Sequence, residues 1–112
     1  MKIRSNQSVC EWKGVEPLAP EIGSKIRIAL GTLKELPING LRHLPENDSN
    51  GWFIWCGEEM TSEKDFFSPL HIHHIQEYLP QVEEYLSLPP GYRFLIDGEN
   101  YEDVWQDLDL LK

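Results

Sequence analysis

Three histidines stand close together in the stretch HIHH, as His71, His73 and His74. We predict a helix here, and helix residues three apart share a face, so His71 and His74 could point together at a metal ion while His73 projects away from both. A metal site needs a third ligand, and the sequence contains no H-E-x-x-H motif or comparable spacing. A small metal-dependent enzyme using His71 and His74 is therefore a minor alternative to a partly exposed, pH-sensitive helix surface.

Carboxylates form the largest set of side chains that could do chemistry. Paired acids can act as general acid and base, but such a pair is usually accompanied by a pocket of polar groups that bind a substrate. Here the acids lie at the ends of expected strands and turns, so we interpret them as a solvated rim that docks a basic partner. The alternative is an ordinary charged surface. The residues concerned are Glu58, Glu59, Glu63, Asp65, Glu99, Glu102, Asp103, Asp107 and Asp109.

No side chain stands in the sequence context of a catalytic nucleophile. The serines Ser62, Ser68 and Ser87 have no G-x-S-x-G motif around them, and no P-loop or G-x-G-x-x-G motif occurs. Cys56 lies in an apolar run, where a buried thiol is inert. We therefore predict that the protein is not an enzyme and has no catalytic, cofactor-binding or metal-binding residues.

The two cysteines indicate the redox environment. Cys10 and Cys56 are far apart in sequence and stand among apolar residues, which fits reduced thiols in a cytosolic protein. A disulfide between them stays open as an alternative. The chain has no apolar run typical of a signal peptide and no stretch of about 18 apolar residues. We therefore expect a cytoplasmic protein that is neither exported nor inserted in a membrane.

The net charge of −9 is unevenly distributed along the 112 residues. Residues 1–45 contain seven Lys/Arg and four Asp/Glu, for +3, whereas residues 46–112 contain three and fifteen, for −12. Such an acidic surface repels nucleic acid and anionic lipid and attracts basic proteins by electrostatic steering. We therefore expect a protein partner rather than a nucleic acid or a membrane, although acidity that serves only solubility is the alternative explanation.

The first half of the chain gives a mixed pattern. Apolar residues at helical spacing predict a helix over residues 20–37, whereas Ile26, Ile28 and Leu30 would also form one face of a short strand, with Gly31 then in a turn. Residues 38–51 are dense in Asn, Gly, Pro and Asp and predict a loop. The unbroken apolar run from Trp52 to Cys56 predicts a central strand.

The second half is clearer. Ser68 suits a helix N-cap with Pro69 at the first helical position, and Pro80 predicts a kink or the start of a second helix. Residues 92–96 predict a strand, with Val104 and Trp105 in its hairpin partner. The expected apolar face of the helix is Ile72, Ile75, Leu79, Val82 and Leu86, and the leucines expected to pack over the core are Leu108, Leu110 and Leu111. We predict one α+β domain over residues 1–112, mainly an antiparallel sheet with packed helices.

Three stretches carry a family resemblance: GLRHLPENDSNGWFIWCGEE, DFFSPLHIHH and LPPGYRFLIDGENYEDVWQD. Their order and spacing resemble the small bacterial immunity-protein domains encoded beside polymorphic toxins, the family called immunity protein thirty-three. The resemblance is clearest over residues 41–107. It implies a cytoplasmic protein that holds a cognate toxin in an inactive complex without a cofactor.

The acidic composition agrees with that implication, because steering charge and aromatic anchors suit an inhibitor of a basic toxin. We place the predicted contact at the acids after Cys56 and at those around Trp105. The predicted contact residues are Glu58, Glu59, Asp65, Glu102, Asp103, Trp105 and Asp107. The alternative function is a general protein-interaction module with another partner.

Overall fold

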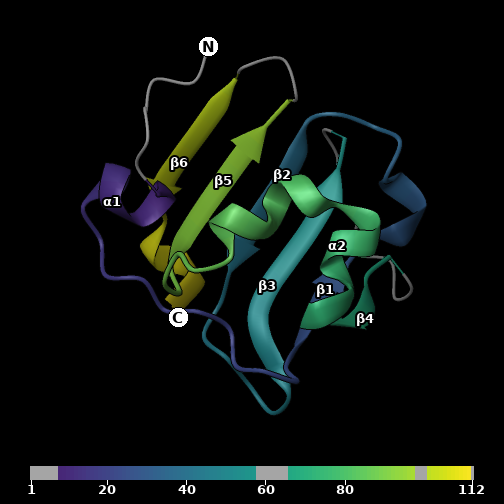
Figure 1. Cartoon of the computed structure of the whole chain (residues 1–112), viewed down its shortest axis with the longest axis horizontal. Helices are drawn as coiled ribbons and strands as arrows, with labels where there is room; N and C mark the ends of the chain where they lie inside the picture. The colour runs from purple at the N-terminus through teal and green to yellow at the C-terminus, as the bar shows by residue number, and fades with distance from the viewer. Residues whose placement is uncertain (1–7, 58–65, 98–100, 112) are drawn as a thin grey trace.

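The computed structural model describes residues 8–57, 66–97 and 101–111. A six-stranded sheet forms the body of the domain, and the helical segments α1, α2 and η3 pack on one of its faces (Figure 1). This confirms the predicted α+β class. The strands are β1 (Lys25–Ile28), β2 (Ile38–Arg42), β3 (Ser49–Cys56), β4 (Ser68–His71), β5 (Tyr92–Ile96) and β6 (Glu102–Gln106). The α-helices are α1 (Val9–Lys13) and α2 (Ile75–Tyr78), and the 3-10 helices are η1 (Leu30–Thr32), η2 (Ile72–His74), η3 (Pro80–Tyr85) and η4 (Leu108–Leu111).

The strands lie side by side in the order β4-β1-β3-β2-β5-β6. Neighbouring strands run antiparallel except β1 and β3, which are parallel, so the predicted mainly antiparallel sheet is confirmed. The predicted strand at residues 52–56 is the inner part of β3, which begins at Ser49 and lies between β1 and β2. Within the described ranges, β4 and β6 form the two edges of the sheet.

The helix predicted over residues 20–37 is wrong. The chain forms β1 and then the single turn η1, as the strand alternative had it. Ile26 and Ile28 are fully buried on one face of β1, whereas Leu30 lies in η1 and is exposed. Pairing of β1 with β3 and β4 decides the outcome, because the local apolar spacing suits either structure.

The loop predicted over residues 38–51 is wrong at both ends, since β2 and the start of β3 lie there. The pair Asn39-Gly40 looks like a turn but lies in mid-strand, where Asn39 Nδ2 donates to the carbonyl of Gly57 at 2.8 Å. A Cβ atom at Gly40 would overlap the ring of Phe94 on β5. The glycine therefore serves close packing across the sheet rather than a change of chain direction.

The helical layer begins later than predicted. Ser68 and Pro69 belong to β4 rather than to a helix start, and an edge strand tolerates the missing N–H of proline. Pro80 starts η3, which confirms the predicted second helical segment. The predicted apolar face is also confirmed, because four of its residues are buried and Ile72 packs against them. The buried four are Ile75, Leu79, Val82 and Leu86.

The end of the chain confirms the predicted hairpin and corrects one detail. β5 and β6 pair antiparallel, with Phe94 opposite Val104. Of the three leucines expected to cover the core, Leu110 is buried, whereas Leu108 and Leu111 are exposed. The prediction was wrong for these two because η4 is a single 3-10 turn that directs one apolar side chain inward.

All the helical segments are short. The five-residue α1 is fixed by a capping box, in which Ser8 and Glu11 each bind the backbone N–H of the other, and by Gly14 in the left-handed region at its C-cap. Val9 and Cys10 bring this turn into the core. Over the described ranges, no helix is long and apolar enough to span a bilayer.

The two faces of the sheet carry two apolar clusters. The main core joins one face to the helical layer and includes Trp52, Ile54 and Phe94. The opposite face, here called the open face, carries a smaller cluster of Ala29, Leu41, Trp55 and Leu110, with Phe53, Phe66 and Phe67 packed against it. Trp55, which lies in the predicted central strand, is buried on the open face.

Arg42, at the end of β2, is the largest charged group in the core and is 2% exposed. Its Nε donates to the carbonyl of Asn50 at 2.9 Å, and its Nη1 donates to those of Leu18 at 2.7 Å, Leu88 at 2.8 Å and Leu86 at 3.4 Å. Burial lowers the pKa of Arg42 to about 10, so the guanidinium is still charged at neutral pH. One side chain therefore joins the segment before β1, the start of β3 and the end of the helical layer.

We expect Arg42→Met to lower the free energy of unfolding by about 2–4 kcal/mol, because carbonyls buried beside Arg42 lose their donor. Arg27→Met is the matched control. Arg27 lies in β1 of the same sheet but is exposed, so its substitution should change the free energy of unfolding by no more than about 0.5 kcal/mol. Urea unfolding followed by tryptophan fluorescence measures both. Equal midpoints for the two variants would contradict the structural role of Arg42.

Candidate functional site

Strand β6 carries three of the seven residues predicted to contact a partner, and strand alternation distributes these three over both faces of the sheet. Val104 is buried in the main core, so Glu102, two residues before it, also points to the helical side. Asp103 and Trp105 alternate onto the open face, and Asp107 follows directly after the strand. The predicted contact residues on β6 therefore do not form one continuous patch.

Glu102 is engaged inside the domain. Its carboxylate accepts a hydrogen bond from the hydroxyl of Tyr85 in η3. Tyr85 is buried, and its ring stacks on Phe94 with the centroids 4.7 Å apart. Glu102 thus links β6 to the helical layer, which gives this acid a structural role whether or not it contacts a partner.

Asp107 and Trp105 share one neighbour, Arg93 on β5. Arg93 Nη1 donates to Asp107 Oδ2 at 3.2 Å, and the guanidinium carbon lies 5.4 Å from the centre of the Trp105 ring. Asp103 is exposed, and no ion pair joins it to another residue in the part of the chain that the structure describes. On β6, Asp103 is therefore the carboxylate most available to a partner, while Asp107 is partly neutralised.

The other predicted contact residues are Glu58, Glu59 and Asp65, which follow β3 in the sequence. All three lie outside the described residues. Their contact with a partner stays a prediction.

The histidine cluster differs from its predicted geometry. His71 ends β4, whereas His73 and His74 lie in η2, so the three are not on one helix. The rings of His73 and His74 are nearest, with centroids 4.1 Å apart, so the prediction that His73 points away from both neighbours is wrong. His74 Nδ1 lies 2.6 Å from Glu77 Oε2. Among the described residues, no three His, Cys, Asp or Glu side chains are arranged to hold a metal ion.

Both thiols are free and buried. Burial raises the pKa of the Cys10 thiol, whose Sγ lies 3.5 Å from the carbonyl of Ser87. Burial, with a smaller contribution from the charge of Glu35, raises the pKa of the Cys56 thiol. Neutral, enclosed thiols are poor nucleophiles, which supports the prediction that Cys56 is inert.

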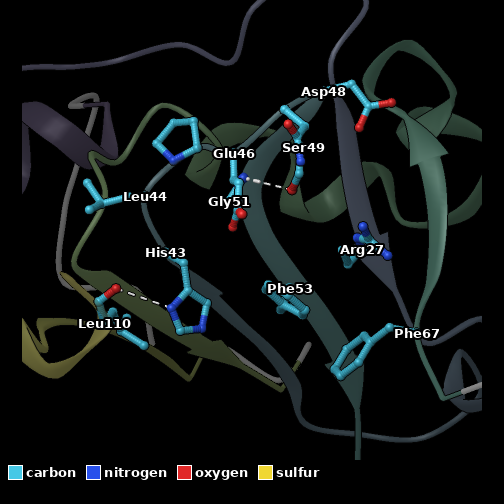
Figure 2. Close-up of a pocket in the computed structure, with 12 residues that line it drawn as sticks. Arg27, His43, Leu44, Glu46, Asp48, Ser49, Gly51, Phe53, Phe67 and Leu110 are labelled. Atoms are coloured by element: carbon cyan, nitrogen blue, oxygen red, sulfur yellow. Dashed lines mark hydrogen bonds between the residues drawn. The ribbon is translucent and has the colours of Figure 1, made fainter. Parts of the chain in front are cut away.

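The open face contains a hollow of about 720 Å³, shown in Figure 2. The rings of Phe53 and Phe67 line it in an edge-to-face arrangement, 5.2 Å between centroids, and Arg27 lines it from β1 (Figure 2). His43 Nδ1 lies 3.2 Å from the carbonyl of Leu110, and since a carbonyl only accepts, Nδ1 carries the proton. The segment 44–49 forms the outer rim.

A second hollow, of about 420 Å³, lies on the other side of that rim. The segment 45–49 is common to both hollows, and the segment 18–24 forms the opposite wall of the second one. Lys25 Nζ lies 3.0 Å from Asp48 Oδ2 in the rim, and this hydrogen bond with its opposite charge lowers the pKa of Asp48.

Neither hollow was predicted from the sequence. Both depend on β1 and β2, which were predicted as a helix and a loop, and on contacts of residues 24–28 with β3 that span more than twenty positions. One local feature of the sequence could have indicated residues that line the hollows. The stretches PLAPEIG and HLPEND read as loops, yet each contains a large aliphatic residue beside a proline, where loops usually carry polar residues.

We expect both thiols to be protected in the folded protein. At pH 7.5, reaction with a thiol-specific disulfide reagent should be about a hundredfold slower than for free cysteine, because each thiol must first be exposed by local opening. In concentrated urea, the two cysteines of the chain should react rapidly. A thiol that reacts fast without denaturant would contradict the buried positions of Cys10 and Cys56.

Comparison with known proteins gives one family. A model described as the Imm33-like domain matches residues 5–107, which covers nearly the whole chain and includes all of the strands. No curated protein and no solved structure matches the chain. The family match agrees with the resemblance seen in the sequence, and the chain belongs to the Imm33-like domain family.

Proposed function

We propose that this protein binds a cognate bacterial toxin and holds it in an inactive complex, without catalysis and without a cofactor. The observation that carries the proposal is the family match over residues 5–107, since an immunity-protein family suggests toxin neutralisation in broad terms. Such families are generally non-enzymatic. Inhibition by binding needs a stable, preformed surface rather than catalytic groups. The six-stranded sheet, with loops held to it by hydrogen bonds such as those of Arg42 and Asn50, is consistent with inhibition by binding.

The charge distribution supports a basic toxin as the partner. Residues 46–112 carry a net charge of −12, and a field of this sign speeds the approach of a cationic protein while repelling nucleic acid. Complementary charge raises the association rate more than it raises the final affinity, so tight binding also needs apolar anchors.

The residues of β6 that the sequence predicted are one candidate contact for the toxin, and Asp103 is the exposed one among them, whereas Glu102 and Trp105 are half-buried. A general interaction module with another partner would use the same kind of surface, so only the identity of the partner separates the two functions. No observation favours a metal-dependent enzyme built on His71 and His74.

Co-expression tests the proposal. The toxin encoded beside this gene should stop growth alone and permit growth with this protein, and a catalytically inactivated toxin should copurify with it. Association measured at low salt should slow by about tenfold or more at high salt if steering contributes. An unrelated acidic domain of similar size is the control. A neighbouring gene product that is neither toxic nor bound would refute the proposal.

A further inference from the structure

One end of the domain presents aliphatic side chains to solvent on ordered loops. Ile22 is fully exposed, Leu44 is 55% exposed and Leu18 is 50% exposed. Leu18 and Ile22 line the smaller hollow, and Leu44 lines the larger one. The segment 45–49 lines both hollows, so the three aliphatic residues lie around one part of the surface. We call the segments 18–24 and 44–48 together the loop-end surface.

These loops are fixed from both sides, so the exposure of Ile22 does not arise from a free chain end. Ser24 Oγ donates to the carbonyl of Glu21 at 2.6 Å and accepts from Asn50 Nδ2 at 3.2 Å. The N–H of Lys25 donates to the carbonyl of Asp48 at 2.8 Å, which joins the two loops directly. Arg42 holds the carbonyl of Leu18 from beneath. Apolar groups held in water at fixed positions are preorganised to bind, with little entropy left to lose.

The charge around these aliphatic residues is negative. Residues 14–24 and 43–49 contain Glu16, Glu21, Glu46 and Asp48 and no Lys or Arg. Lys25 offsets Asp48, whereas no ion pair within the described ranges reaches Glu21 or Glu46. Arg27 lies on β1 and lines only the larger hollow, whereas Arg42, which lines the smaller one, is buried and donates to backbone carbonyls. The partner that fits has Lys or Arg side chains beside apolar ones.

We propose that the loop-end surface is where the toxin docks, with apolar toxin side chains against Ile22, Leu44 and Leu18 and basic ones against Glu21 and Glu46. This inference rests on the proposed function and names its contact surface. A second copy of the chain is a poorer occupant, because a symmetric dimer would bring the same unpaired carboxylates together. The hollows on either side of the segment 45–49 are concave enough to receive side chains from the toxin.

The decisive comparison uses three double variants and the catalytically inactivated toxin from the neighbouring gene as the probe. Ile22→Asp with Leu44→Asp changes the loop-end surface. Leu36→Asp with Tyr78→Asp is the matched control, since these side chains are 56% and 43% exposed and lie outside the loop-end surface. Asp103→Lys with Trp105→Ala tests the alternative contact on β6.

The loop-end variant should bind the toxin at least about tenfold more weakly, mainly through faster dissociation, while the control stays within about twofold. The melting temperature of the loop-end variant should match that of the parent, because Ile22 and Leu44 are exposed. In addition, Glu21→Lys with Glu46→Lys should slow association at low salt, and the difference should shrink at high salt.

The outcomes separate the two proposals. A parent protein that binds while the loop-end variant binds equally well overturns this inference and leaves the proposed function standing. If only the β6 variant loses binding, the contact lies at Asp103 and Trp105. That result also overturns this inference and leaves the proposed function standing. If the chain forms a dimer that the loop-end variant dissociates without a change in toxin affinity, the surface is a self-interface and the inference fails. A parent that does not bind the toxin refutes both.

Discussion

The burial of the Arg42 cation, which forms no ion pair with any carboxylate that the structure describes, organises the packing around it. A guanidinium removed from water requires several strong acceptors, and Arg42 obtains them from backbone carbonyls in three separate parts of the chain. Trp52 uses one of the same acceptors, since its Nε1 donates to the carbonyl of Leu86 at 3.0 Å. The need to solvate one charge thus fixes the segment before β1, the start of β3 and the end of the helical layer relative to one another.

This constraint links the core to the surface. The carbonyl of Leu18 belongs to a segment with no strand or helix of its own, and Arg42 provides its donor from below. Ser24, Asn50 and Lys25 then join this segment to the loop before β3. Two irregular loops become a rigid end of the domain, which is what a surface for tight protein binding requires.

The sequence predicted the elements whose signals are local. The run Trp52–Cys56, the hairpin of β5 and β6, and the helix start at Pro80 follow from apolar runs, turn residues and proline geometry. β1 and β2 could not be predicted in this way, because β1 pairs with β3 and β4, and β2 pairs with β5, across long stretches of the sequence. Gly40 is an instructive case: its signal suggests a turn, whereas the ring of Phe94 on another strand explains it. Likewise, the acids of β6 could be identified from their charge. That Glu102 points to the helical side could be inferred only once Val104, two residues later on the same strand, was known to lie in the main core.

Hydrogen–deuterium exchange of the free and toxin-bound protein shows whether a toxin binds this chain at the loop-end surface. Toxin binding there should slow exchange in peptides that cover residues 18–24 and 44–50, with little change in α2 and η3. Exchange that the toxin leaves unchanged throughout the chain would count against binding itself, and slowing only in α2 and η3 would count against the loop-end surface.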